Sequence, residues 1–566
     1  MTGASILRGL AVAGVLLAPT AVDGQTAQTA PPGKAAYDRW CAGCHGVDGK
    51  GEGPGAGTMM PRPRDFTTGK YEIRSTPSGA LPTDEDMLGV ILDGMPGTAM
   101  PAWRDHFGDR ELADLIAYLK SFSRFFESQP APEAVPMASA PAADEAALAE
   151  GREFYEKIEC NKCHGPQGRG NGPSAPTLED DAERPVRAAD LTENWLFNGG
   201  GSVEEIHERL VTGLNGTPMP SFHDLVDAEF MTEDQLWRVA QYVHSLAPEE
   251  PPRVSEVVRA TRIEGELPGS VDDAVWETAE RFYVPLVGQV IVHPRWFAPM
   301  VDGVWVQALH NGREVALRLV WHDPSESPDP RWDEWQSKVV AVMETEAPGS
   351  AASAAADTAA PPAQEETTVA VADTAALEPA SPNAPYPDAL VVQFPRSIPE
   401  GMERPYFLMG DERNPVYLWR WESGGEGADE LLARGLSRYE PLGGAEPGSV
   451  AAEAVYDEGE WRLLLRRTMD AGGVEDRIGF EAGRAIPMAL FAWDGSNGES
   501  GTQGSIGSWY FLYLDQPTAS TVYVAPILAT LLTAALGVVV VMRAQRRAGG
   551  GAGRRSRTES TEGGEA

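Results

Sequence analysis

Apolar residues recur at helical spacing in four short segments of the N-terminal half of the chain. The segments are 33–40, 111–120, 151–159 and 233–243, and each places apolar side chains three or four positions apart. Such spacing predicts amphipathic helices. The order of an opening and a closing helix occurs twice, with Gly- and Pro-rich sequence between them, which we expect to form loops. The pattern therefore predicts two small all-α repeats.

The pattern changes from about residue 256 to 515, where short apolar runs alternate with turn residues. The runs lie at 304–309, 315–321, 390–394, 415–421, 461–466 and 509–514. Asn311-Gly312 separates the first two runs and favours a tight hairpin. Helical periodicity is scarce, so we predict an all-β antiparallel sandwich. Residues 346–383, rich in Ala, Pro, Thr and acidic residues, are expected to form a disordered insertion.

Both ends of the chain carry long apolar stretches. Residues 1–24 combine Arg8 with an apolar run and small residues, which is typical of a secretory signal peptide. Residues 521–542 contain no charge and are long enough to cross a bilayer as one helix. Arginines are frequent in the tail 543–566, and positive charge favours the cytoplasmic side. We therefore expect a single-pass protein of the inner membrane with its bulk in the periplasm; a buried core helix is the competing interpretation.

All four cysteines of the chain lie in two copies of one motif, Cys-x-x-Cys-His. The copies are Cys41, Cys44 and His45, and Cys160, Cys163 and His164. Two thiols next to a histidine indicate covalent attachment of haem c, with the histidine as axial iron ligand. Two disulfides or a zinc site would also use these cysteines. A gap of two residues is awkward for a structural disulfide, and zinc needs further ligands in a tetrahedron.

A methionine follows each motif at the same distance. His45 and Met100 are 55 residues apart, as are His164 and Met219. Both methionines lie in the sequence Gly-Thr-x-Met-Pro, which favours Met100 over the nearby Met95 as the partner of His45. A His–Met pair saturates the iron and suits electron transfer rather than binding of oxygen or peroxide.

Both repeats resemble class I c-type cytochromes in the helix leading into Cys-x-x-Cys-His, the methionine loop and the closing helix. The resemblance implies two cytochrome c domains, at 33–126 and 148–247, joined by a linker at 127–147. It also implies two covalent haem c groups with His45/Met100 and His164/Met219 as axial pairs. The fold expected for the whole chain is multidomain, with two all-α cytochrome c domains, then the sandwich, then one transmembrane helix.

The sandwich resembles the haem-binding domain of the gamma subunits of ethylbenzene dehydrogenase-type enzymes. The matching stretches are 302–323, 404–411, 415–421 and 491–496. The resemblance implies a haem b, with Met409 as one axial ligand. The family's second ligand is a lysine before the last strand, but this chain has Gln503-Gly504-Ser505-Ile506 there. His293, His310 and His322 are the candidate substitutes; without haem, the sandwich would dock a partner or bind a ligand.

The chain is strongly acidic, with a net charge of −38. This argues against nucleic acid as a partner and is compatible with steering of a basic redox protein or with general solubility. No motif requires catalysis on a substrate, so we predict an electron-transfer protein rather than an enzyme. The expected partners are periplasmic redox proteins, either a molybdenum oxidoreductase, in which the chain would be a subunit, or a soluble cytochrome.

Two further function classes fit parts of the sequence. One is a cytochrome fused to a non-redox recognition module, which fits a sandwich without haem. The other is a dihaem peroxidase, which needs one iron with an open position. The two axial methionines argue against the peroxidase.

Overall fold

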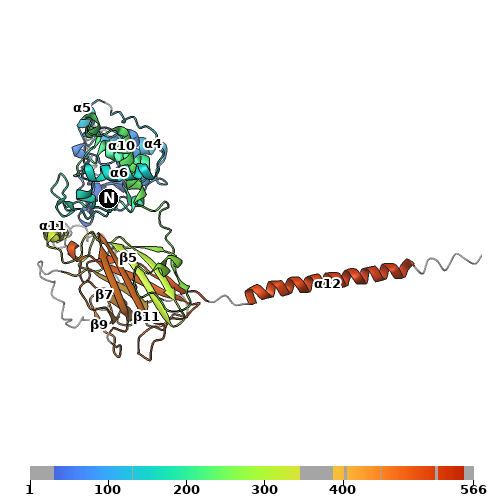
Figure 1. Ribbon diagram of the computed structural model, residues 1–566. Helices are drawn as coiled ribbons and strands as arrows, with labels where there is room; N and C mark the ends of the chain where they lie inside the picture. The colour runs from blue at the N-terminus through green and yellow to red at the C-terminus, as the bar shows by residue number, and fades with distance from the viewer. Residues whose placement is uncertain are drawn as a thin grey trace, which may run out of the picture.

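The protein consists of a helical part, a β part and one long separate helix (Figure 1). The computed structural model describes residues 31–130, 132–344, 386–400, 404–446, 448–516 and 521–552. The predicted signal peptide and the predicted insertion at 346–383 lie outside the described residues, as does the tail beyond residue 552. The predicted fold class, with two helical cytochrome-like regions followed by a β domain and a C-terminal apolar helix, is confirmed.

The helical part contains two repeats that share their main elements and differ in one short helix. In repeat 1 the elements are α1 (Lys34–Trp40), α2 (Ala42–His45), η1 (Ala56–Thr58), η2 (Phe66–Thr68), α3 (Asp84–Asp93), α4 (Asp109–Lys120) and α5 (Phe125–Ser128). In repeat 2 they are α6 (Glu145–Lys157), α7 (Asn161–His164), η3 (Ala175–Thr177), η4 (Asn194–Leu196), α8 (Val203–Thr212), α9 (His223–Asp227) and α10 (Glu233–Ser245). The short helix that differs is α5 after the closing helix α4 in repeat 1, and α9 before the closing helix α10 in repeat 2. Helix α6 begins earlier than expected, inside the segment assigned to the linker.

The opening and closing helices of each repeat cross at a glycine. A Cβ atom on Gly33 would lie 2.1 Å from the carbonyl oxygen of Asp114 in α4, and one on Gly151 would lie 2.1 Å from that of Arg238 in α10. Real Cβ atoms do not approach so closely, so both positions require glycine. The glycines therefore allow the backbones of the paired helices to touch.

The expectation of loops alone between the opening and closing helices is wrong, because α3 and α8 lie there. Each of these helices begins with a capping box, in which Thr83 pairs with Asp86 and Ser202 with Glu205. A capping box satisfies the first free N–H groups of a helix. The sequence signal was present, but the surrounding glycines and prolines hid it.

The β part is a two-layered sandwich. Its strands are β1 (Val257–Arg262), β2 (Phe282–Pro285), β3 (Val287–Gly288), β4 (Gly303–His310), β5 (Glu314–His322), β6 (Ala389–Pro395), β7 (Val416–Glu422), β8 (Ala428–Ala433), β9 (Tyr439–Pro441), β10 (Ala451–Asp457), β11 (Glu460–Thr468), β12 (Ala485–Trp493), β13 (Ser505–Ile506) and β14 (Tyr510–Leu514). The helical segments among them are η5 (Ala274–Thr278), η6 (Pro330–Trp332), α11 (Asp333–Glu344) and η9 (Gly495–Asn497). Every run predicted as a strand is a strand, and β4 and β5 form the predicted hairpin.

One strand joins the two layers. The first half of β12 pairs with β14 and its second half pairs with β6, so the strand order is β10-β11-β5-β4-β1-β14-β12-β6-β7-β8-β9. Strand β1 runs parallel to both β14 and β4, which makes the sheet mixed rather than purely antiparallel. The core between the layers includes Trp321, Trp421 and Trp461, whose ring centroids lie 4.9–6.2 Å apart.

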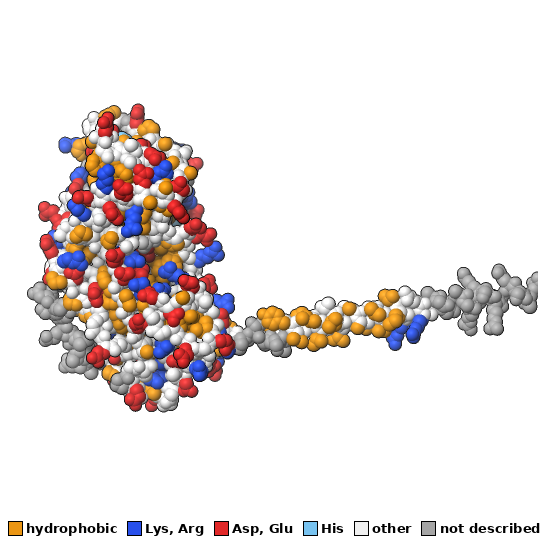
Figure 2. All heavy atoms as spheres, in the orientation of Figure 1, with side chains coloured by type: hydrophobic (Ala, Val, Ile, Leu, Met, Phe, Trp, Pro, Cys, Tyr) orange, Lys and Arg blue, Asp and Glu red, His pale blue; other side chains and the backbone are white. Residues whose placement is uncertain are grey.

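Helix α12 (Thr521–Ala552) stands apart from the folded domains (Figure 1). Residues Val522–Arg547 are apolar enough to cross a bilayer, and none of the apolar window is buried against protein. Hydrophobic side chains run along the helix and basic ones gather near its far end (Figure 2). Length and composition thus fit the predicted span.

Candidate haem sites

Each Cys-x-x-Cys-His motif lies on one helical turn directly after an opening helix. The amide of Cys41 donates to the carbonyl of Tyr37 at 2.8 Å, and that of Cys160 donates to the carbonyl of Tyr155 at 3.0 Å. All four thiols are free in the structure. Burial raises the pKa of Cys41 to about 11 and that of Cys160 to about 12. Both motifs therefore present a pair of protonated thiols one turn apart.

The two motif histidines are held in the same way. Nδ1 of His45 lies 3.0 Å from the carbonyl oxygen of Arg64, and Nδ1 of His164 lies 2.9 Å from that of Ala189. A carbonyl only accepts, so Nδ1 must carry the proton and Nε2 keeps its lone pair. Burial lowers the pKa of both imidazoles, which favours the neutral form. A neutral histidine with Nδ1 bonded to a carbonyl is the usual form of an axial ligand.

A buried tyrosine closes the motif turn in both repeats. The hydroxyl of Tyr37 donates to the carbonyl of Gly46 at 2.6 Å, and that of Tyr155 donates to the carbonyl of Gly165 at 2.7 Å. The tyrosines link the opening helix to the residue after each histidine. The sequence indicated both tyrosines as apolar positions of the opening helices but not as hydrogen-bond donors to the motif turn.

The methionine loops also match residue by residue. Met95 donates its amide to the carbonyl of Met100 at 3.0 Å, and Leu214 donates to that of Met219 at 3.1 Å. Met95 therefore occupies the position of a leucine, which has no ligand atom. The amide of Met100 also donates to the hydroxyl of Thr98, and the amide of Met219 donates to a threonine hydroxyl in the same place. This equivalence supports Met100 and Met219 as the paired candidates.

Repeat 1 packs on the methionine loop of repeat 2. The side chain of Arg74 is fully buried and donates to the carbonyls of Thr212 and Gly213, the latter at 3.1 Å. Burial lowers the pKa of this arginine to about 10. The amide of Gly79 donates to Asn215 Oδ1 at 3.2 Å. The two candidate sites are therefore joined by short contacts between loops.

Repeat 2 in turn packs on the sandwich. Nδ1 of His322, at the end of β5, lies 3.1 Å from Oδ2 of Asp190, the residue after Ala189. Arg169 forms an ion pair with Glu460 at 3.1 Å. Arg187 donates to the carbonyl of Ala298 at 3.1 Å. The sandwich thus contacts the loop that holds the His164 imidazole.

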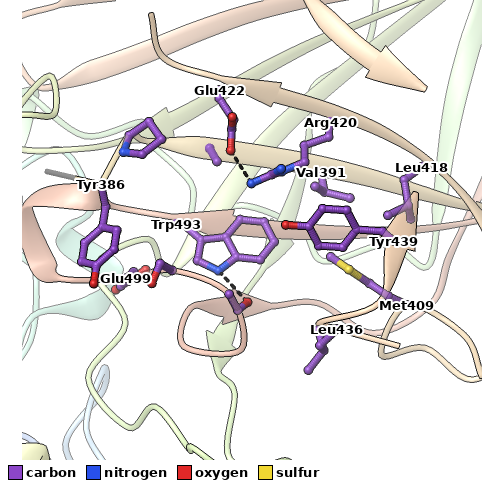
Figure 3. A pocket seen from close by; sticks show the side chains of 14 residues that line it. Tyr386, Val391, Met409, Leu418, Arg420, Glu422, Leu436, Tyr439, Trp493 and Glu499 are labelled. Atoms are coloured by element: carbon purple, nitrogen blue, oxygen red, sulfur yellow. Dashed lines mark hydrogen bonds and ion pairs between the residues drawn. The ribbon is translucent and has the colours of Figure 1, made fainter. Parts of the chain in front are cut away.

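Met409 lies in a separate pocket of the sandwich (Figure 3). It is 2 % exposed, has a left-handed backbone with φ of 55°, and donates its amide to Gln393 Oε1 at 2.9 Å. Its thioether points toward the rings of Tyr439 and Trp493. Among the described residues, none that line this pocket is a histidine or a lysine. The residues present do not supply an iron ligand pair of the expected kind.

The three histidines considered as substitutes lie elsewhere. His310 Nε2 is 2.9 Å from the carbonyl oxygen of Asp515, and His322 faces Asp190. His293 is exposed on a loop. Ligation of haem b by Met409 stays a prediction without a partner ligand.

Residues 28–119 match the family described as cytochrome c oxidase, cbb3-type, subunit III, and residues 148–247 match the cytochrome c family. Cytochrome c55X of Paracoccus denitrificans is 39% identical over 117 residues, which are 19% of this chain and 91% of that protein. The two family matches fall on the repeats built around the two motifs.

Two further relatives are haem or gamma subunits of reductases. The "Putative respiratory nitrate reductase heme subunit ORF7" of Haloferax mediterranei is 33% identical over 123 residues, 22% of this chain and 42% of that protein. The chlorate reductase subunit gamma of Ideonella dechloratans is 28% identical over 127 residues, 22% of this chain and 49% of that protein. The chain therefore spans about half the length of these relatives or less.

Among solved structures, a chain of the Kuenenia stuttgartiensis reducing HAO-like protein complex Kustc0457/Kustc0458 is 42% identical, with a TM-score of 0.36. The match covers 38% of this chain and 96% of that one. A family 9 carbohydrate-binding module from Caldicellulosiruptor kristjanssonii matches 46% of this chain and 98% of that one, at 7% identity and a TM-score of 0.22.

Proposed function

We propose that this chain, which belongs to the c-type cytochromes, relays single electrons through two haem c groups in the periplasm. The observation that carries the proposal is the repeated arrangement of a free thiol pair, a histidine with Nδ1 bonded to a carbonyl, and a methionine loop. Haem c bound there would supply one-electron redox chemistry. The thiols are assigned to attachment, and His45/Met100 and His164/Met219 to axial ligation.

The chain's own residues would set the geometry and the access. The carbonyls of Arg64 and Ala189 fix the proton on Nδ1, so that Nε2 of each histidine would be free to bind iron. The thioethers of Met100 and Met219 would also bind the iron and would leave no position open to a reactant. Thioether ligation also raises the reduction potential. The role of the protein would then be to orient each haem, to occupy the ligand positions of its iron and to exclude water.

The contacts between the parts support a linear route. Repeat 1 contacts repeat 2 through Arg74, and repeat 2 contacts the sandwich through Asp190 and Arg187. Electrons would pass between the two haem sites, and the sandwich would hold repeat 2 and dock a partner. The reductase haem subunits among its relatives support an oxidoreductase of that general kind as the partner, with this chain as a separate carrier or as one of its subunits.

Helix α12 supports the proposed attachment to the inner membrane. It is long, apolar and unburied, and Arg543, Arg546 and Arg547 follow its uncharged part, residues 521–542. Positive charge after the span favours the cytoplasmic side for the tail and the periplasm for the domains. Fractionation of cells that express the full chain checks this placement, since a chain recovered in the soluble periplasm would contradict it.

A pyridine haemochrome assay on the full chain, made in a host that attaches haem c, tests the proposal. We expect two haem c groups per chain, retained after acid–acetone extraction. Absence of covalent haem would overturn the proposal. Extractable haem b, lost in Met409→Leu and retained in Met95→Leu, would establish the third haem.

A further inference from the structure

Three aspartates from distant parts of the chain meet at one edge of the sandwich. Asp323 follows β5, Asp388 precedes β6 and Asp494 follows β12. One carboxylate oxygen from each lies within 4.8 Å of the others, and all three side chains are fully buried. The fold therefore brings three carboxylates together beside the last residues of β5 and β12 and the first residue of β6.

Two oxygens of this aspartate cluster accept no hydrogen bond. Oδ1 of Asp323 accepts from the amide of Ser325 at 3.1 Å, and Oδ1 of Asp494 accepts from the amide of Asn497, but their Oδ2 atoms have no donor. The buried hydroxyl of Ser325 also has no partner. An unsatisfied buried oxygen is costly, and a cation would satisfy several at once.

The remaining aspartate is fixed by donors from around it. Asp388 accepts from the amide of Ser327 at 2.7 Å, from the amide of Gly495 at 3.0 Å and from Nε1 of Trp461 at 3.1 Å. These bonds hold the carboxylate in one orientation. The cluster is thus pre-organised by backbone and by the aromatic core.

Another buried acid in the sandwich, Glu430, is stabilised by ion pairs, which is the usual arrangement for a buried carboxylate. Glu430 is 7 % exposed and lies between Arg467 and Arg477. In the described part of the chain, no lysine or arginine forms an ion pair with any of the three aspartates. Burial and mutual repulsion raise the pKa of Asp323 and Asp494. Buried Arg187 interacts electrostatically with Asp494 but also with Glu499 and Asp302, so it does not balance the three aspartates. The remaining negative charge is offset by protons or by a bound cation.

We propose that Asp323, Asp388 and Asp494 bind one calcium ion. The donor set is all oxygen, which suits a hard cation, and contains no histidine or cysteine for zinc or copper. Calcium accepts six to eight oxygens in flexible geometry, whereas magnesium retains several waters and is disfavoured at a fully buried site. The Ser325 hydroxyl is a further ligand candidate.

The position of the site gives it a structural consequence. Asp323 follows His322, which contacts Asp190, and Asp190 follows the residue whose carbonyl holds His164. An ion at the cluster would fix the end of β5 that meets repeat 2. Calcium would therefore stabilise both the sandwich and its contact with repeat 2.

Metal analysis of the full chain, purified in detergent with calcium present, tests the inference. We expect one calcium ion per chain and its loss on treatment with EGTA. Loss of the ion should lower the thermal midpoint of unfolding by about 5–10 °C, the shift expected when the calcium concentration before treatment is well above the Kd. Added calcium should restore the midpoint. A chain without stoichiometric metal and with no response to EGTA would show that the aspartates hold protons and would overturn the proposal. Restoration by magnesium alone would overturn the choice of calcium.

Variants locate the ion. Asp494→Asn should lose the calcium and the response to EGTA. Glu430→Gln is the matched control, because it weakens another buried acid but should keep both. If Asp494→Asn does not fold, terbium luminescence of the wild-type chain decides: excitation of Trp461 should give a signal that calcium displaces, and Trp461→Phe should reduce it. A signal unchanged in that variant would contradict this location.

Discussion

The two repeats hold their histidines identically but differ in what lies behind them. In repeat 1, Asp65 follows the carbonyl that binds His45 and accepts from the amide of Thr67 at 2.8 Å. In repeat 2, Asp190 occupies the same place and accepts from the amide of Thr192 at 2.8 Å. Of these two aspartates, Asp190 alone contacts the sandwich in the described part of the chain, and its partner there is His322.

The difference shows that the sandwich contacts the two repeats in different ways. The loop that holds His164 meets the sandwich through the contact of Asp190 with His322, whereas repeat 1 approaches it through Met60, which packs against the apolar cluster of Trp296 and Met300. The two haem sites should therefore share their ligands and their reactivity but differ in their response to the sandwich. The predictions below test both halves of that statement.

Removal of the thiols should have the largest effect. Cys41→Ala with Cys44→Ala, and separately Cys160→Ala with Cys163→Ala, should each halve the covalent haem measured by haemochrome assay, because each pair serves one site. The repeat 2 variant should in addition lower the thermal midpoint of the sandwich. Equal thermal effects of the two pairs would contradict the asymmetry.

Removal of one methionine should open one iron. Met100→Ala and Met219→Ala should each bind carbon monoxide at one haem in the reduced state. The potential of that haem should fall on the order of 100 mV, within the roughly 0.8 V range that axial ligands span. Met95→Ala is the control and should do neither. Carbon monoxide binding in the control would reassign the ligand of repeat 1.

Acid should weaken repeat 2 more than repeat 1. His207 in α8 is buried and stacks on Trp237 at 3.6 Å, while the matching position in α3 is Leu88. Burial lowers the pKa of His207 to about 4, below its ordinary value, so its contribution is present above pH 6.5 and is lost as the pH falls towards 4.

The substitution His207→Leu should remove this loss, which we expect to be about 2 kcal/mol. Urea unfolding of the full chain, followed at each haem from pH 7 to 4, measures it. His106→Leu, at an exposed histidine, should leave the pH profile unchanged. An unaltered profile in His207→Leu would assign the acid sensitivity to other groups.

Loss of the contact with the sandwich should have the smallest effect. His322→Ala removes the imidazole that contacts Asp190. A carboxylate that has lost this contact, beside the loop that holds His164, should favour the ferric state of the repeat 2 haem. The potential of the repeat 2 haem should fall by about 40 mV, the equivalent of about 1 kcal/mol for one electron. The repeat 1 haem should not change. His310→Ala, at a sandwich histidine away from repeat 2, should shift neither, and a shift of both haems by His322→Ala would contradict the one-sided contact.

The sequence predicted the parts of the molecule that depend on local spacing. The Cys-x-x-Cys-His motifs, the equal distances from His45 to Met100 and from His164 to Met219, and the apolar runs of β4 and β5 can all be read from the order of residues along the chain. The structure has helices and strands where these patterns predict them. Helices α3 and α8 were missed because the many glycines and prolines around them indicated loops, although each helix begins with a capping box. The parallel pairing of β1 was missed because it joins segments far apart in the chain.

The sites made by folding could not be predicted in the same way. Asp323, Asp388 and Asp494 are separated by tens of residues and share no motif. The contact of His322 with Asp190 joins two domains. The proximity of such groups can be predicted only when the strand order and the domain packing are known. The second ligand for Met409, expected from resemblance alone, has no counterpart in the pocket.

Exposure of the reduced, wild-type full chain to carbon monoxide tests the central claim most directly. With histidine and methionine on both irons, we predict no change in the absorption spectrum of either haem at neutral pH. Binding of carbon monoxide to either haem of the native chain would contradict the account, because it would show an iron with an open position.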